Sequence, residues 1–336
     1  MKNWWPKARA TKPKAASPAA VRPSAENILK RLEWTVIRRL DGLLQGDYRT
    51  LMRGAGIDLA DLREYQHHDD VRHIDWNVTA RLSIPHVREF MEDREMAAWF
   101  LVDLSPSVDF GSGEHAKRSV SAEFVAVLAR VITRRGNRVG AMLYGSGVDT
   151  VIPTRGGRRH VLHVLDSISK RPAAKPQGQT QLRELIEAGA ALVKRRSTIF
   201  VISDFISEPG WERALALLAQ RHEVVAVRVV DPLELDLPDL GLLTMRDSET
   251  GEQLLVDTHD KGFRRRFARI AAQREAELRD AFIKAGVDAL ELATDSDLAD
   301  AVVRFVEMRK RRSRLYAGGG LPMHLSSHLS SNARAA

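Results

Sequence analysis

The segment AWFLVDLSPS, residues 98–107, constrains the fold of this chain more than any other stretch. Its apolar run is hydrophobic on both faces, which is typical of a strand in the centre of a parallel sheet covered by helices. The run ends at Asp103, and Ser105 and Ser107 follow at alternate positions. Because ligands bind at the carboxyl ends of the strands in such sheets, these three oxygen-bearing side chains stand where a binding site is expected.

The rest of the chain alternates between strand and helix patterns. Further strands are predicted at residues 139–144, 148–152, 198–203, 223–230 and 289–293, a hairpin at 242–256, and helices at 27–44, 116–135, 182–194, 211–220, 261–285 and 295–309. This order predicts an α/β fold, a doubly wound and mostly parallel sheet with helices on both faces, plus an N-terminal helical and loop extension. The run at 198–203 is also apolar and is followed by Asp204.

Four segments are expected along the chain. Residues 1–26, rich in Pro, Ala and Lys, are predicted to form a disordered basic arm. Residues 27–95 contain the first helix and a segment from Arg63 to Trp76, both expected to pack on the main domain. The α/β domain covers residues 96–312, and residues 313–336 form a flexible tail.

Composition excludes several classes of protein. The 336 residues include no Cys, so disulfides, thiolate zinc sites and cysteine nucleophiles are excluded. No apolar run approaches the roughly 18 to 20 residues that a membrane-spanning helix needs. The start of the chain has basic residues but no continuous apolar core of a signal peptide. We therefore expect a cytoplasmic protein.

The net charge of +8 is unevenly distributed. Residues 1–25 and 309–336 each carry +6, which leaves −4 for the body. The body is therefore not expected to bind nucleic acid. An alternative function remains open for the ends, because Arg309–Arg314 or the lysines beside Trp4 and Trp5 could contact nucleic acid or a membrane surface.

The residues expected to carry function are Asp103, Ser105, Ser107, Thr180 and Asp204. All five offer oxygen ligands, which suit a hard cation, magnesium before manganese or calcium. With only two carboxylates, part of the ion's positive charge would stay available for a carboxylate of a partner. Each residue also has an ordinary structural reading, as a helix cap, a helix-start residue or a solvated strand end.

Other motifs are weaker. His67, His68, Asp69, Asp70, His73 and Asp75 include metal-ligand types, but pairing of the loop's Asp and Arg side chains with each other and with backbone amides is favoured. Gly111-Ser112-Gly113 lies too far beyond its strand for a dinucleotide site, and the chain has no phosphate-binding Gly-Lys-Ser/Thr loop. A magnesium-dependent hydrolase with Asp103 as nucleophile is a less favoured alternative, because further carboxylates and a catalytic Lys would be expected.

The pattern Asp-x-Ser-x-Ser, with a distant Thr and a later strand-ending Asp, resembles the metal-ion-dependent adhesion site of von Willebrand factor A-like domains. Arg63-Glu64-Tyr65, Asp69-Asp70-x-Arg72-x-Ile74-Asp75-Trp76, Ala80-Arg81 and Gly286-Val287-Asp288 to Thr294 also resemble the bacterial family called domain of unknown function 58, over roughly residues 45–310. Gln179 and Phe205 differ from the usual glycines without removing a ligand.

This resemblance implies a von Willebrand factor A-like fold and an adaptor rather than an enzyme. It also implies that Asp103, Ser105, Ser107, Thr180 and Asp204 bind the ion. Family members are associated with MoxR-type AAA ATPases. The expected partners are therefore such an ATPase and a client protein that offers a carboxylate, and the expected setting is chaperone-like remodelling of clients.

Overall fold

The computed structural model describes residues 24–43, 62–66, 71, 74–88, 97–113, 115–172 and 178–317. The greater part of the predicted arm and tail, and the residues from His67 to Asp70, lie outside the described residues. Within the described ranges, none of the helices combines the length and the apolar character needed to cross a bilayer.

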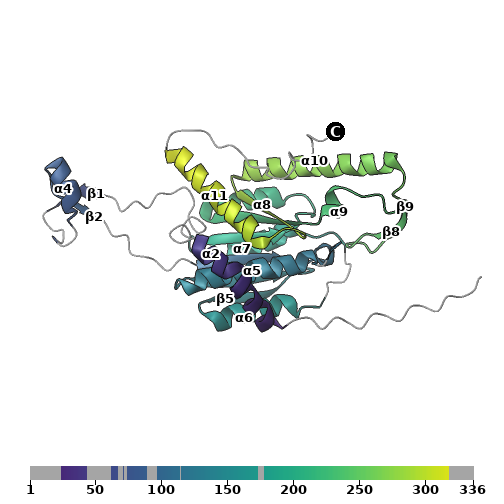
Figure 1. Ribbon diagram of the computed structural model, residues 1–336, viewed down its shortest axis with the longest axis horizontal. Helices are drawn as coiled ribbons and strands as arrows, with labels where there is room; N and C mark the ends of the chain where they lie inside the picture. Colours follow the sequence, from purple (N-terminus) through teal and green to yellow (C-terminus); the bar gives the residue numbers. More distant parts are fainter. Residues whose placement is uncertain are drawn as a thin grey trace, which may run out of the picture.

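A six-stranded sheet forms the centre of the domain, in the order β10-β7-β6-β3-β4-β5 (Figure 1). Its strands are β3 (Ala97–Asp103), β4 (Arg138–Tyr144), β5 (Val148–Arg155), β6 (Thr198–Ser203), β7 (Glu223–Val230) and β10 (Asp288–Ala293). Every neighbouring pair is parallel except β4 and β5, which pair antiparallel through a bulged register. The predicted α/β class with a mostly parallel sheet is confirmed.

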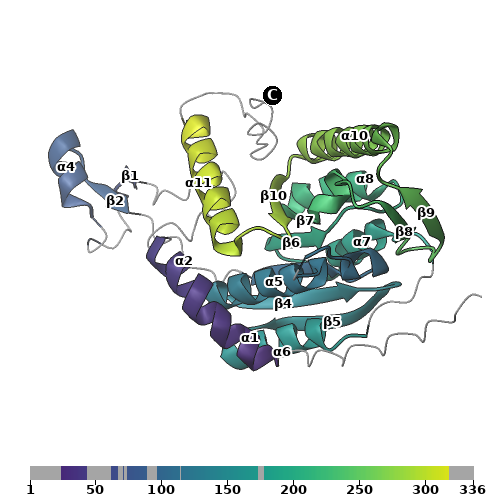
Figure 2. The same cartoon turned by 45° about the vertical axis from the view of Figure 1, so that its right-hand side comes forward.

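Helices cover both faces of this sheet (Figure 2). One face carries α1 (Ala25–Leu32), α2 (Arg38–Leu43), α5 (Lys117–Arg134), α6 (Arg158–Ser169) and α11 (Leu298–Ala317); the other carries α7 (Leu182–Leu192), α8 (Trp211–Arg221) and α10 (Lys261–Ala285). The sheet is therefore doubly wound, as the alternating pattern predicts.

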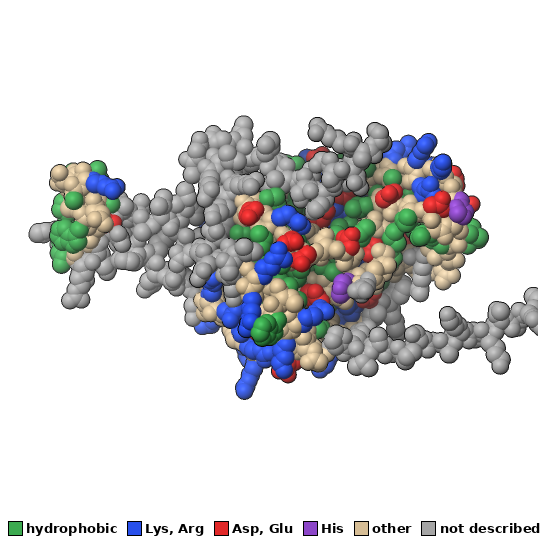
Figure 3. Space-filling model, in the orientation of Figure 1, with side chains coloured by type: hydrophobic (Ala, Val, Ile, Leu, Met, Phe, Trp, Pro, Cys, Tyr) green, Lys and Arg blue, Asp and Glu red, His purple; other side chains and the backbone are tan. Residues whose placement is uncertain are grey.

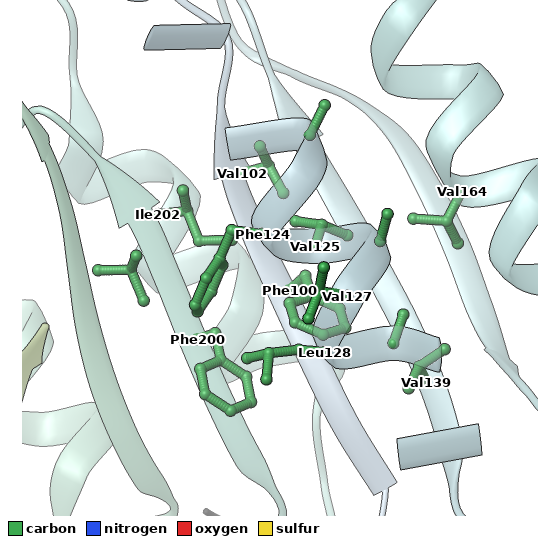
Figure 4. Packing of buried hydrophobic residues seen from close by; sticks show 14 of the residues in the cluster. Phe100, Val102, Phe124, Val125, Val127, Leu128, Val139, Val164, Phe200 and Ile202 are labelled. Carbon is green, nitrogen blue, oxygen red and sulfur yellow. The ribbon is translucent and has the colours of Figure 1, made fainter. Parts of the chain in front are cut away.

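The central strand β3 explains why both faces are apolar. Its side chains alternate, so that Phe100 and Val102 point into one core while Trp99 and Leu101 point into the other. Phe100 stacks against Phe200 with ring centroids 5.3 Å apart, among the packed side chains of Figure 4. The single strand β3 therefore contributes buried side chains to the hydrophobic cores on both faces of the sheet.

The ends of the domain differ from the expected boundaries. The first helix begins at Ala25, inside the predicted arm, because the Ser24 side chain accepts a hydrogen bond from the Asn27 amide and caps it. A π-helical segment, η1 (Glu33–Ile37), interrupts this helix before α2. At the other end, α11 continues into the predicted tail, and Asp297 caps its first turn by accepting a hydrogen bond from the Asp300 amide.

A small unit lies between α2 and β3 in the sequence. It consists of β1 (Leu62–Glu64), α4 (Trp76–Leu82) and β2 (His86–Arg88), and β1 pairs antiparallel with β2. In both views it is drawn apart from the sheet (Figures 1 and 2). Its large apolar side chains Trp76 and Leu82 are exposed, so little apolar surface is buried here.

Replacement of Phe100 by Ala is expected to lower the free energy of unfolding by about 3–5 kcal/mol, because the ring is fully buried and its loss leaves a cavity. Urea denaturation of the full chain measures this change. Leu217→Ala on the exposed side of α8 is the control and should stay within about 0.5 kcal/mol of the wild type. Equal stability of both variants would contradict the assigned role of β3.

Candidate functional site

The two strand-ending aspartates lie at one edge of the sheet because β3 and β6 are parallel neighbours. Asp103 is fully buried there. Its Oδ1 atom accepts a hydrogen bond from the Ser105 amide at 2.9 Å, and its Oδ2 atom accepts one from the Ser203 hydroxyl at 2.7 Å. Burial, with repulsion from Asp204, raises the pKa of Asp103 from 3.8 to about 6.

The two serines that follow β3 come together in a tight turn. Pro106 begins a 3₁₀ helix, η3 (Pro106–Asp109), directly after Ser105. The hydroxyl oxygens of Ser105 and Ser107 are 3.1 Å apart, and both residues are buried. The Asp-x-Ser-x-Ser segment therefore presents its oxygens as one group.

Thr180 reaches the same edge in the loop before α7. The Tyr144 hydroxyl, at the end of β4, accepts a hydrogen bond from the Gln181 amide at 3.1 Å. The Thr180 carbonyl accepts hydrogen bonds from the Ser207 hydroxyl at 2.8 Å and from the Glu208 amide at 2.9 Å. These bonds fasten the loop between the ends of β4 and β6. All five residues singled out in the sequence thus lie at this edge.

Asp204 is buried and not a solvated strand end. Its Oδ2 atom accepts a hydrogen bond at 2.7 Å from the ammonium group of Lys117, which is itself fully buried at the start of α5 and also contacts Glu234 at 2.5 Å. Burial alone would lower the pKa of Lys117, but attraction to the two carboxylates raises it overall. Lys117 therefore stays charged in the folded protein.

Glu234 is held in place by a helix cap. It lies in α9 (Pro232–Leu235), where it forms a capping box with Asp231 at the end of β7. The Asp231 carboxylate also accepts hydrogen bonds from the amide and the hydroxyl of Ser112 at 2.8 and 2.6 Å. The Gly111–Gly113 loop is thereby bound to the sheet, and these contacts give it a structural role.

Phe205, where the sequence departs from the usual glycine, keeps a glycine-like backbone. Its φ angle is +59°, in the left-handed region. The side chain packs with Trp211 and Phe282 at ring centroid distances of 5.1 and 4.9 Å. This aromatic packing holds a strained residue directly after Asp204.

A fourth carboxylate reaches the edge from a separate two-stranded sheet, β8 (Leu242–Arg246) and β9 (Gln253–Asp257). Glu249, in the turn between these strands, accepts a hydrogen bond from the Thr180 hydroxyl on Oε1 at 3.0 Å. Burial raises the pKa of Glu249, interactions with Thr180 and Ser107 lower it in part, and the charge of Asp204 raises it further. Oε2 of Glu249 is buried and has no hydrogen-bond partner among the described residues.

Sequence reasoning missed Lys117, Ser203, Glu234 and Glu249. Ser203 directly precedes Asp204, and the capping-box pattern Asp231-Pro232-Leu233-Glu234 could have placed a carboxylate at the end of β7. The hairpin turn containing Glu249 was predicted, but no local pattern indicates which distant residue its tip contacts. Lys117 carries no local signal either, because its partners are contributed by other strands.

The donor chemistry of this edge fits a hard divalent cation. Asp103 and Asp204 bring two carboxylates to this edge, Glu249 reaches it through Thr180, and the positive charge of Lys117 is shared between Asp204 and Glu234. Buried negative charge of this kind is costly unless it is paired with a cation. Among the described residues, no group of three or more His, Asp or Glu is arranged as a metal site, so the hydroxyls would have to supply a large share of the ligands.

Two other features of the sequence have structural partners. Asp75 caps α4 by accepting hydrogen bonds from the amides of Asn77 and Val78, in line with the favoured reading of its loop. The remaining acidic residues and histidines of that loop lie outside the described residues. From the basic run that begins at Arg309, only Arg309 has a described side chain, and it pairs with Asp288 and Glu223.

Basic side chains also gather where α1 and α6 meet, as Figure 3 shows. Several of them are in ion pairs there: Arg31 with Glu123, Arg130 with Glu33, and Arg158 with Glu26 and Glu33. These pairs join the N-terminal helix to α5 and α6. This surface is therefore partly neutralised by its own acidic neighbours.

Comparison with known proteins identifies relatives over most of the chain. The family model described as "Protein of unknown function DUF58" matches residues 61–277. "Uncharacterized protein Rv1480" of Mycobacterium tuberculosis is 38% identical over 289 residues, which cover 86% of this chain and 91% of that protein. "Uncharacterized protein MAV169" of Mycobacterium avium is 36% identical over 162 residues, 48% of this chain and 95% of that protein.

Two solved structures are also similar. The conserved hypothetical protein BatB from Bacteroides thetaiotaomicron matches with a TM-score of 0.41 and 15% identity, over 64% of this chain and 99% of that chain. The SpRpn10 VWA domain matches with a TM-score of 0.36 and 14% identity, over 62% of this chain and 94% of that chain.

Lys117→Met keeps the aliphatic stem but removes the buried positive charge. It is expected to lower the free energy of unfolding by about 3–5 kcal/mol, because Asp204 and Glu234 are left without their counter-charge. Urea denaturation at pH 7.5 and at pH 5 measures this change. The loss of stability should be smaller at pH 5, because burial raises the pKa of Glu234 and this group takes up a proton more readily there. Lys170→Met, at an exposed lysine, is the matched control. Equal losses in both variants would contradict the charge pairing.

The raised pKa of Asp103 predicts a pH dependence of stability in protein kept in a chelator. The folded state holds this proton up to about pH 6, whereas the ordinary value is 3.8, so stability falls as the pH rises through this window. The loss from this group is on the order of 3 kcal/mol. Asp103→Asn should remove this contribution to the fall of the free energy of unfolding between pH 4 and pH 6.5, as measured by urea titrations. An unchanged pH dependence in this variant would contradict the raised pKa of Asp103.

Proposed function

The chain belongs to the family of proteins of unknown function DUF58, and from this premise we propose that its von Willebrand factor A-like domain is a noncatalytic protein-interaction module that depends on a divalent cation. One observation carries the proposal. Three separate segments bring two aspartates and three hydroxyls to a single edge of the sheet, where the two buried aspartates repel each other.

Each residue has a distinct task in this proposal. Ser105, Ser107 and Thr180 offer neutral oxygens that leave the ion's charge largely uncompensated, and Asp103 and Asp204 balance part of it. Ser203 and the Ser105 amide orient Asp103, while Lys117 orients Asp204. A bound cation, magnesium before manganese or calcium, supplies a positive centre to which the carboxylate of another protein can bind.

A noncatalytic role is supported by how the acidic groups are engaged. Both oxygens of Asp103 accept hydrogen bonds inside a fully buried setting, which leaves a poor nucleophile for a hydrolase. Lys117 is held by two carboxylates and is therefore not available as an acid or base. We therefore rank an adaptor above a magnesium-dependent hydrolase.

The partner in this proposal is a MoxR-type AAA ATPase, together with a client protein that presents a carboxylate. This part rests on the resemblance of the sequence to its family. The setting would be cytoplasmic remodelling or assembly of clients, in which the domain links the ATPase to its target through the ion.

Ser105→Ala tests the proposal with little change in shape. It is expected to weaken Mg²⁺ binding at least tenfold and to abolish Mg²⁺-dependent capture of a purified MoxR-type ATPase, because one neutral ligand is lost. Calorimetry measures the first effect and surface-immobilised capture the second. Ser119→Ala, at an exposed serine of α5, is the control. Capture that persists in chelator would contradict the proposed mode of binding.

A further inference from the structure

The turn of the β8–β9 hairpin is built to present Glu249. The Asp247 carboxylate accepts hydrogen bonds from the amides of Glu249 and Thr250 at 2.8 and 3.1 Å. Gly251 has a φ of +78°, and its amide donates to the Asp247 carbonyl, which closes the turn. The position of Glu249 is therefore set by backbone geometry and does not depend on a freely rotating loop.

Glu249 makes its contact at the candidate ion site. Its Oε1 atom accepts the proton of the Thr180 hydroxyl, which leaves the lone pairs of the Thr180 oxygen free for a cation. Its Oε2 atom is buried and has no hydrogen-bond partner in the described part of the chain, although Ser107 lies near enough to lower the pKa of this carboxylate in part. An ion bound beside Thr180 would supply a partner for this oxygen.

The hairpin belongs to neither core of the main domain. It forms its own two-stranded sheet, and Leu242, Leu254 and Leu255 are 62–66% exposed. Figure 2 shows it beside the end of the sheet toward which the β4 arrow points. Val256 is the one buried apolar side chain among the described residues of β8 and β9, and Leu243 and Met245 are half-buried. Displacement of the hairpin therefore costs less than displacement of a core element.

We propose that Glu249 is an intramolecular carboxylate ligand of this ion site, so that the β8–β9 hairpin occupies the position that a partner's carboxylate would take. This inference rests on the proposed function. A partner must then displace a tethered competitor, and tethering gives such a competitor a high effective concentration. The hairpin thus limits capture to partners that bind strongly enough to release it.

The test uses Mn²⁺ as the probe on the full chain. Glu249→Gln is expected to weaken Mn²⁺ binding about tenfold, measured by electron paramagnetic resonance. It should also raise the water-proton relaxivity per bound Mn²⁺, because a water molecule takes the freed position. Added acetate should then lower the relaxivity of this variant at concentrations that leave the wild type unchanged.

Two variants keep the result interpretable. Glu252→Gln removes the same charge from an exposed side chain of the same hairpin and should match the wild type in all three measurements. Glu249→Asp keeps the charge but shortens the reach, and it should raise the relaxivity as Glu249→Gln does. Thermal melting in chelator verifies that the variants fold.

The outcomes separate this inference from the proposed function. If the wild type binds Mn²⁺ and Glu249→Gln has the same affinity and relaxivity, Glu249 is not a ligand and the inference is wrong, while the ion site stands. If the wild type binds no Mn²⁺, the proposed ion site is wrong and this inference falls with it.

Discussion

The repulsion between Asp103 and Asp204 is the constraint around which this end of the molecule is arranged. Parallel pairing of β3 with β6 brings both carboxylates to one buried edge, where water cannot screen them. Lys117 offsets the charge of Asp204, and Ser203 with the Ser105 amide stabilises Asp103. The neighbouring turns and loops position Lys117, Ser203 and the Ser105 amide against these two carboxylates.

The support of the site extends well beyond the residues that would touch an ion. Asp231 fixes α9, α9 holds Glu234, and Glu234 shares Lys117 with Asp204. On the other side, the aromatic packing of Phe205 maintains the backbone conformation after Asp204. Preorganised binding sites require rigid surroundings of this kind, because affinity falls when the side chains that hold the ion must be ordered on binding.

The sequence predicted those parts of the fold that have a local cause. Apolar runs that stop at Asp103 and at Ser203 predicted the central strands and the edge at which the site lies, because strand ends are visible in a hydrophobicity pattern. The antiparallel direction of β5, the π-helical turn after Leu32 and the partners of Lys117 depend on contacts between distant segments, which one sequence does not reveal. Glu249 is the clearest case, since its turn was predicted and its contact was not.

The first helix of the domain packs on α11, the last helix that the structure describes. Arg39 in α2 pairs with Asp300 in α11, and Leu29 and Ile37 belong to the same core as Phe305. During synthesis on the ribosome, this face of the sheet therefore stays incomplete until nearly the whole domain has emerged. Until α11 is in place, the apolar face of the first helix lacks part of its packing partner, so this face of the sheet is the last to be sealed from water.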